Sequence, residues 1–270
     1  MTMTVRKPAV AGSFYPGTRD RLRGQIATLW PRAAHERPAI GVVVPHAGYV
    51  YSGRVAAAVF AQVETPDTVI ILGPNHSGLG ARAAIMTEGQ WETPLGSVPL
   101  DVELGQAILA GSPTMREDPL GHLREHSLEV QLPLLQYRER PFRLVPICLL
   151  GHDYGLCQEV GWAIARAVMD TAKRVLLVAS TDMSHYVSRA EASRQDQKAL
   201  NAILEMDPPA LFRVAQEEKI SMCGYPPTAA TLIAAIALGA TRAELLIYTD
   251  SGEVTRTFDQ VVGYAGLVIR

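Results

Sequence analysis

The chain has 270 residues, 48% of them apolar, and its 25 Lys and Arg residues nearly balance its 27 Asp and Glu residues. A chain of this length can bury a substantial core, and without a basic excess it has no charge to hold a nucleic-acid backbone. Its apolar runs are shorter than a membrane span, and its N-terminus lacks the apolar region and cleavage site of a signal peptide. We therefore expect a cytoplasmic globular protein that binds neither nucleic acid nor membranes.

Short apolar runs alternate with longer helical patterns along the chain. In chain order the sequence predicts a helix at 19–30, a strand at 40–44, a helix at 53–62, strands at 68–72 and 83–86, helices at 102–110 and 127–137, a strand at 143–149, a helix at 154–171, a strand at 174–178, helices at 189–205, 208–216 and 228–238, and strands at 244–249 and 261–268. This alternation is typical of a sheet covered by helices on both faces, and no linker or repeat divides the chain. We expect one α/β domain over residues 1–270, with a mixed, mostly parallel sheet whose last two strands form a hairpin.

Polar side chains follow three of the predicted strands. The segment "IGVVVPH" ends in His46, "TVIILGPNH" ends in His76, and "RVLLVASTDMSH" leads to Asp182 and His185. Ligands of open α/β sheets bind at the carboxyl ends of the strands. A single histidine after a strand is more often an ordinary loop residue, but three at equivalent positions predict a site at this edge.

The cysteines form neither a CxxC pair nor an even disulfide set. Cys148 and Cys157 fit the pattern of small core residues. Cys223 lies in the turn "SMCGYPP" just before a predicted helix, whose N-terminus is expected to lower the pKa of the thiol toward the metal-binding thiolate. With His46 and His76 it would form a tertiary metal site suited to iron, copper or zinc. The alternative is a buried turn cysteine without a ligand.

A competing motif lies in the middle of the chain. The segment "HLREH", from His122 to His126, matches the H-x-x-E-H pattern of inverted zinc metallopeptidases. A proline and a glycine just upstream indicate that His122 precedes the helix, so the two histidines are not expected to share a metal. Glu125, His126 and Glu129 could still reach the crevice, and their alternative role is capping of the following helix.

Six ordered segments give the chain a wider resemblance. They read "RKPAVAGSFYPG", "VVPHAGYVYSG", "ILGPNHSG", "EHSLEVQLPLLQ", "STDMSHY" and "CGYPPTAA". On these segments the sequence is identified as a member of the MEMO family, which includes the AmmeMemoRadiSam system protein B of bacteria and archaea. The resemblance implies a three-layer α/β/α sandwich similar to the class III extradiol dioxygenases, which hold non-haem Fe(II) with two histidines and a glutamate.

The resemblance also implies roles for single residues. By motif, His46 and His76 match the two histidine ligands, Cys223 stands in place of the third ligand, and Asp182 and His185 match an additional polar pair. A histidine in the region of His185 serves as acid and base in the dioxygenases. Cysteine in place of glutamate is a departure, because a thiolate is softer and can be oxidised. We expect Fe(II), with copper or zinc as alternatives, while dioxygenase turnover does not follow from the fold.

Three functions are consistent with these residues. The first is a non-haem iron oxidoreductase that acts with O2 on a small molecule, in which Asp182 orients His185 for proton transfer. The second is a binding or redox-signalling module whose crevice holds a peptide or a small anion without turnover. The third is a hydrolase with Cys223 as nucleophile and His185 as base. The residues expected to line the opening are Tyr15, Tyr49, Tyr225 and His126, and the tyrosines have packing at loop edges as their alternative role.

Overall fold

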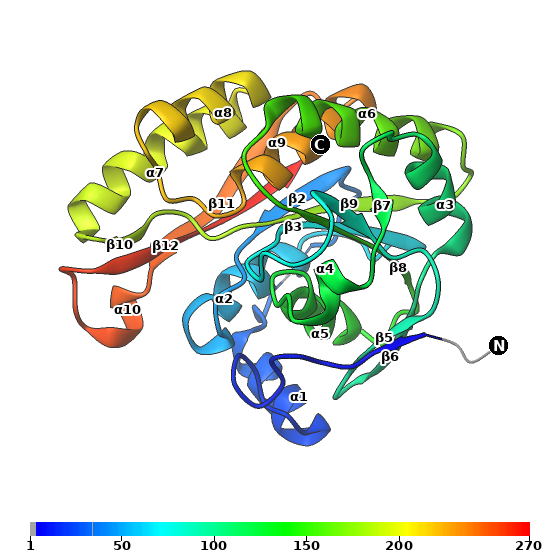
Figure 1. Cartoon of the computed structure of the whole chain (residues 1–270). Coiled ribbons are helices and arrows are strands. Elements are labelled where there is room, and N and C mark those ends of the chain that lie inside the picture. The colour runs from blue at the N-terminus through cyan, green and yellow to red at the C-terminus, as the bar shows by residue number, and fades with distance from the viewer. Residues whose placement is uncertain (1–3, 34) are drawn as a thin grey trace.

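A nine-stranded sheet runs through the molecule, with helices against both faces (Figure 1). The computed structural model describes residues 4–33 and 35–270. In order across the sheet the strands are β10 (His185–Val187), β12 (Val261–Ile269), β2 (Gly41–Val44), β9 (Val175–Ser180), β3 (Thr68–Pro74), β8 (Arg143–Leu149), β4 (Ala83–Ile85) and β7 (Arg116–Glu117), while β11 (Ala243–Asp250) pairs with β12.

The centre of this sheet is parallel and its flanks contain antiparallel pairs. Strands β2, β9, β3 and β8 run in one direction. On one side β12 runs antiparallel to β2 and to β11, and on the other β4 runs antiparallel to β8. The predicted mixed sheet and terminal hairpin are confirmed, and a further parallel pair, β4 with β7, lies at one edge. The carboxyl ends of β2, β9 and β3 therefore lie side by side.

The central strands are apolar on both faces because each face meets its own core. Strand β2 reads "GVVV" and β3 begins "TVIIL", and all these residues are buried. Val43 and Ile70 belong to one hydrophobic cluster, whereas Val42 and Ile71 belong to the other. This follows from the alternation of side chains along a strand.

Helices cover both faces and complete three layers (Figure 1). One core contains side chains of α3 (Val102–Ala110), α6 (Tyr154–Met169), α7 (Arg189–Leu204), α8 (Pro208–Glu217) and α9 (Tyr225–Ala237). The other contains side chains of α1 (Arg19–Leu29), α2 (Tyr49–Phe60), η1 (Glu129–Gln131) and α5 (Leu132–Gln136). The predicted three-layer α/β/α sandwich is confirmed. In the described part of the chain, no helix has the length and apolar character needed to cross a bilayer.

Several short elements escaped the sequence patterns. They are α4 (Leu120–Leu123), α10 (Gly252–Thr255) in the β11–β12 connection, the edge strands β7 and β10, and a small sheet of β1 (Val5–Arg6), β5 (Gln90–Thr93) and β6 (Gly96–Pro99). The helix expected at 127–137 is instead a turn followed by η1 and α5, with Pro133 in the first turn of α5. Helix α9 begins at Tyr225, three residues early, because prolines are tolerated in a first helical turn.

Candidate metal centre

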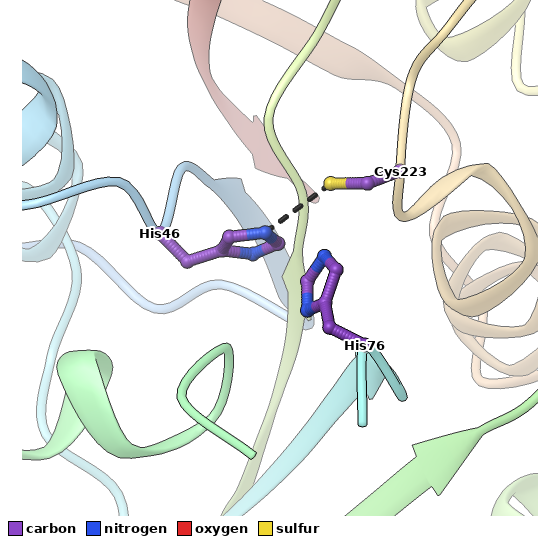
Figure 2. Close-up of side chains that lie close together, drawn as sticks. All are labelled: His46, His76 and Cys223. Carbon is purple, nitrogen blue, oxygen red and sulfur yellow. Dashed lines mark hydrogen bonds between the residues drawn. The ribbon is translucent and has the colours of Figure 1, made fainter. Parts of the chain in front are cut away.

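Three predicted ligands lie together at the carboxyl edge of the sheet (Figure 2). His46 follows β2, His76 follows β3, and Cys223 lies just before α9. One donor atom from each side chain lies within 4.8 Å of the other two. The Sγ atom of Cys223 is 3.2 Å from Nε2 of His46. Segments far apart in the sequence thus bring two imidazoles and one thiol into a single cluster.

Two glycines allow the loops to approach the strand ends this closely. A Cβ atom at Gly224 would lie 2.5 Å from the carbonyl oxygen of Ser180, the last residue of β9. The N–H group of Gly224 donates to Oγ1 of Thr181 at 2.9 Å, which fixes the loop that carries Cys223. A Cβ atom at Gly73 in β3 would likewise lie 2.5 Å from Leu128. Both positions need glycine because backbone or side chain occupies the space of a Cβ.

Hydrogen bonds fix which nitrogen of His46 is free. The hydroxyl of Ser180 donates to the carbonyl oxygen of Ser127 at 2.6 Å, so it can only accept from its other neighbours. It accepts from Nε2 of Gln131 at 2.9 Å and lies 3.0 Å from Nδ1 of His46. Nδ1 of His46 therefore carries the proton, and Nε2 presents its lone pair toward Cys223. Burial lowers the pKa of His46, so its ring is neutral, as a metal ligand must be.

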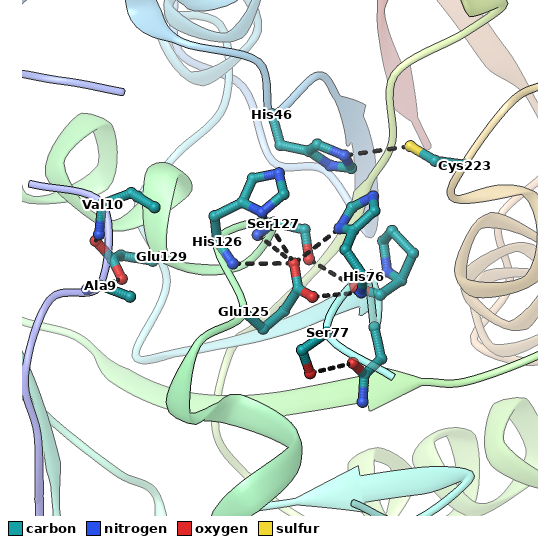
Figure 3. A network of polar contacts seen from close by, with 12 residues as sticks. Ala9, Val10, His46, His76, Ser77, Glu125, His126, Ser127, Glu129 and Cys223 are labelled. Carbon is teal, nitrogen blue, oxygen red and sulfur yellow. Dashed lines mark hydrogen bonds and ion pairs between the residues drawn. The ribbon is translucent and has the colours of Figure 1, made fainter. Parts of the chain in front are cut away.

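A buried carboxylate, Glu125, orients the ring of His76 (Figure 3). Oε1 of Glu125 lies 2.9 Å from Nδ1 of His76, and Oε2 accepts from the N–H of His76 at 2.5 Å. Oε1 also accepts from the N–H groups of His126 and Ser127. Burial acts to raise the pKa of Glu125, but the hydrogen bonds from His76 and the backbone hold it at about 2. Nε2 of His76 is left free for a metal in a carboxylate–histidine arrangement typical of metal sites.

Cys223 is protonated in the protein by itself. Burial, and then the negative charge of Asp182, raise the pKa of the Cys223 thiol. The expectation that the start of α9 would lower this pKa is wrong, because loss of solvation outweighs the helix terminus. The N–H of Asp182 points at Sγ over 3.3 Å and would stabilise a thiolate once a cation displaces the proton.

His126 adds a third imidazole to the cluster. Its ring stacks on that of His76 with centroids 4.6 Å apart and meets the ring of His46 edge-on at 5.4 Å. Burial lowers the pKa of His126. His76, Glu125 and His126 also have donor atoms within 4.8 Å of one another. The position of His126 favours its predicted place at the opening, where its role in substrate binding stays a prediction.

Asp182 and His185 have separate partners. The Oδ1 atom of Asp182 accepts from the N–H groups of His46 at 2.7 Å and Ala47 at 3.3 Å, so it fixes the turn that carries His46. His185 lies in β10, and its Nδ1 donates to the carbonyl oxygen of Ser221 at 2.8 Å. Ser221, rather than Asp182, therefore orients the ring of His185. Its influence on the pKa of His46 places His185 within electrostatic reach of the cluster.

The three tyrosines expected at the opening are all buried. The hydroxyl of Tyr15 donates to Glu129 at 2.5 Å, and that of Tyr49 donates to the carbonyl oxygen of Val130 at 2.6 Å. Tyr225 stacks against His152, with ring centroids 5.1 Å apart. For Tyr15 and Tyr49 the geometry favours the packing role.

The H-x-x-E-H segment is not a zinc-binding helix. Helix α4 is a single turn that contains His122 but ends before Glu125, so the expectation that His122 precedes the helix is wrong. His122 is fully buried, with its ring between the thiol of Cys148 at 3.4 Å and the carbonyl oxygen of Ala84 at 3.2 Å. Only the second half of the motif, Glu125 and His126, reaches the candidate metal centre.

Sequence reasoning missed the residues that hold His46. Ser180 is the last residue of β9 and Gln131 lies in η1, and both are fully buried. Nε2 of Gln131 also donates to the carbonyl oxygen of Pro45 at 2.9 Å, which ties down the residue before His46. The sequence signal for Ser180 was its position as a polar residue at the end of an otherwise apolar strand. Its partner could not be found from spacing, because 49 residues separate the two.

The donor set fits a borderline or soft transition metal. It offers two imidazole nitrogens and a thiol within reach of one point, and the other ring nitrogens of both histidines are already engaged. Such a set suits iron, copper and zinc and disfavours magnesium and calcium, which prefer oxygen ligands.

The fold and this cluster define an α/β/α protein with a candidate metal centre of two histidines and one cysteine. The model of the protein family described as "Memo-like protein" matches residues 6–268 of this chain. A MEMO1 family protein of Methanopyrus kandleri is 43% identical over 279 aligned positions, covering 98% of this chain and 99% of that protein. Relatives of the same name from Methanosarcina barkeri and Methanococcoides burtonii are 45% and 44% identical, each over 98% of this chain and all of the relative. The chain belongs to the Memo-like family.

Proposed function

We propose that the protein binds iron through His46, His76 and Cys223 and acts as an oxidoreductase on a small molecule with O2. The observation that carries the proposal is the arrangement of hydrogen bonds around the two histidines. Each ring has Nδ1 committed to a buried partner and Nε2 free on the side of the cluster. Such pre-orientation is typical of metal ligands and has no evident use in a site that binds no metal.

Bound ferrous iron would supply one-electron redox chemistry and Lewis acidity at this edge of the sheet. The chain's own residues would hold and orient the reactants. Asp182 fixes the turn of His46, and Glu125 fixes the ring of His76. Because Nδ1 of His185 donates to Ser221, Nε2 is its free nitrogen and would accept a proton from a substrate hydroxyl and later return it.

The two alternative functions have less support. A hydrolytic cysteine needs a lowered pKa, and the pKa of Cys223 is raised by burial and by Asp182. His185 is held by Ser221, whereas the nitrogen close to Sγ belongs to His46. A module that binds a peptide or an anion without turnover would use the same crevice, and the oriented histidines do not favour it.

Anaerobic purification followed by metal quantitation and oxygen-consumption measurements tests the proposal. We expect about one iron per chain and oxygen uptake when a catechol is added. Chains that retain no iron after anaerobic reconstitution would contradict the metal centre. Stoichiometric iron without oxygen uptake for any of a panel of small phenols and catechols would favour the binding module.

A further inference from the structure

A pocket lies beside the candidate metal centre. It has a volume of about 440 Å³ and lies between the end of α8, the segment 219–223 and the loop that carries His152. Cys223 is one of its lining residues. Ser221 is another, and three hydrogen bonds join Ser221 to His185. The pocket therefore shares Cys223 with the candidate metal centre, and its lining residue Ser221 is bonded to His185.

The charged lining of this pocket is cationic. Lys219 and His152 line it, and its lining contains no Asp or Glu. Within the described part of the chain, Lys219 makes no ion pair or side-chain hydrogen bond. A lysine that faces a pocket without a carboxylate partner is free to bind an anion.

Two acidic residues next to lining residues in the sequence are paired with other cations, while Asp182 lies on the metal-centre side of Cys223. Glu218 pairs with Lys198 at 2.5 Å, and Asp153, next to His152, pairs with Arg82 at 2.8 Å. Glu217 is exposed on α8 and does not line the pocket. Among the lining side chains, Lys219 is the one with a permanent charge.

The walls also offer a flat surface. The ring of His152 stacks on Tyr225 with centroids 5.1 Å apart and planes only 10° apart, and Ile220 and Met222 add apolar lining. A volume in the range of small-molecule sites, apolar and aromatic walls and one placed cation are the features of a pocket for a small organic acid.

We propose that this pocket binds the anionic tail of the substrate, a carboxylate held by Lys219, while the reactive head of the same molecule lies at the metal centre next to Cys223. The inference rests on the proposed function, because Cys223 and His185 join the pocket to the reaction site. It names the substrate class as a small aromatic or unsaturated organic acid rather than a neutral compound.

Two probes that differ by one carboxylate test the inference. Binding of 3,4-dihydroxybenzoate and of catechol is measured by anaerobic titration of the iron-reconstituted full chain at low salt, and the iron content of every sample is determined. We expect the unmodified protein to bind 3,4-dihydroxybenzoate about two- to fivefold more tightly than catechol, the size of one favourable ion pair in a partly exposed site. Lys219→Met should abolish this preference and leave catechol binding unchanged.

Arg213→Met is the matched control, because it removes one exposed positive charge from α8 outside the pocket. It should keep the preference, and Lys219→Arg should keep most of it. Equal binding of both probes, binding of neither, or an unchanged preference in Lys219→Met would overturn the anion pocket. These results are separable from failure of the metal centre, which would appear as missing iron in the same samples.

Discussion

The candidate metal centre depends on which atom of each side chain is already occupied. His46 and His76 both direct Nε2 to the cluster because buried partners, Ser180 and Glu125, occupy Nδ1. The thiol of Cys223 keeps its proton, because burial raises its pKa. Metal binding would therefore release a proton from Cys223, whereas His46, kept neutral by burial, needs no change of protonation or tautomer.

Glu125→Gln tests this orientation of His76. Glutamine can keep only part of the hydrogen bonding, because its amide nitrogen cannot accept from a ring N–H or a backbone N–H. We expect the affinity for Fe(II) to fall by about 10- to 100-fold, the usual loss when a partner of a metal ligand is replaced. Anaerobic Fe(II) titration measures it. Glu92→Gln is the control, because Glu92 is a partly exposed carboxylate paired with Lys7, and it should leave the Fe(II) affinity unchanged. Full affinity in Glu125→Gln would show that His76 needs no carboxylate.

The histidines, Asp182 and Cys223 could be found from the sequence because each lies beside a strong local pattern, a buried strand or a helix start. Ser180 and Gln131 could not be found, because they orient His46 through a hydrogen bond between segments far apart in the chain. The link between Asp182 and His185 was inferred from their closeness in sequence. In the structure Ser221 holds His185 instead, and such a contact between segments 36 residues apart has no signal in the sequence.

At the scale of elements, short loops place the site and glycine sets their distance from the sheet. Gly224→Ala should destabilise the protein by about 1–3 kcal/mol and weaken Fe(II) binding, because a Cβ would meet the Ser180 carbonyl and Thr181 and push the Cys223 loop outward. Chemical denaturation and iron titration measure the two effects. Gly24→Ala in α1, where a Cβ meets nothing within 4 Å, should instead stabilise by up to about 1 kcal/mol. Similar behaviour of both variants would contradict the close-approach argument.

The N-terminal segment is held to η1 by one buried carboxylate. Glu129 accepts from the N–H groups of Ala9 at 2.7 Å and Val10 at 3.1 Å (Figure 3). It also forms an ion pair with Arg6 and accepts from the hydroxyl of Tyr15. Both side chains of the ion pair are at most 2% exposed, so loss of one charge leaves the other buried without a partner. We expect Glu129→Gln to lower the free energy of unfolding by about 3–5 kcal/mol.

Urea or guanidinium denaturation checks this value. Glu139→Gln is the matched control, because Glu139 forms an exposed pair with Arg23 and its loss should cost no more than about 1 kcal/mol. If Glu129→Gln cost as little as the control, the N-terminal segment would be held by packing rather than by Glu129.

At the scale of the whole molecule, the alternation of apolar strands and amphipathic helices was sufficient to predict the layers, because each central strand faces two cores. The strand order was not predictable from these patterns. Strand β9 lies between β2 and β3, and this order brings Asp182 between the two histidine-bearing strand ends. The small sheet of β1, β5 and β6 has strands too short to carry a period, so it escaped prediction.

The central claim is that two imidazoles and one thiol, drawn from distant parts of the chain, hold iron. Anaerobic Fe(II) titration of His46→Ala, His76→Ala, Cys223→Ser and His185→Ala tests it most directly. We predict at least about a tenfold loss of affinity in each of the first three variants and most of the affinity kept in His185→Ala, whose ring is held by Ser221. Serine preserves the size of Cys223 but stays protonated near neutral pH, so the variant tests ligand chemistry. Full affinity in Cys223→Ser together with lost affinity in His185→Ala would contradict the claim and assign the third ligand to His185.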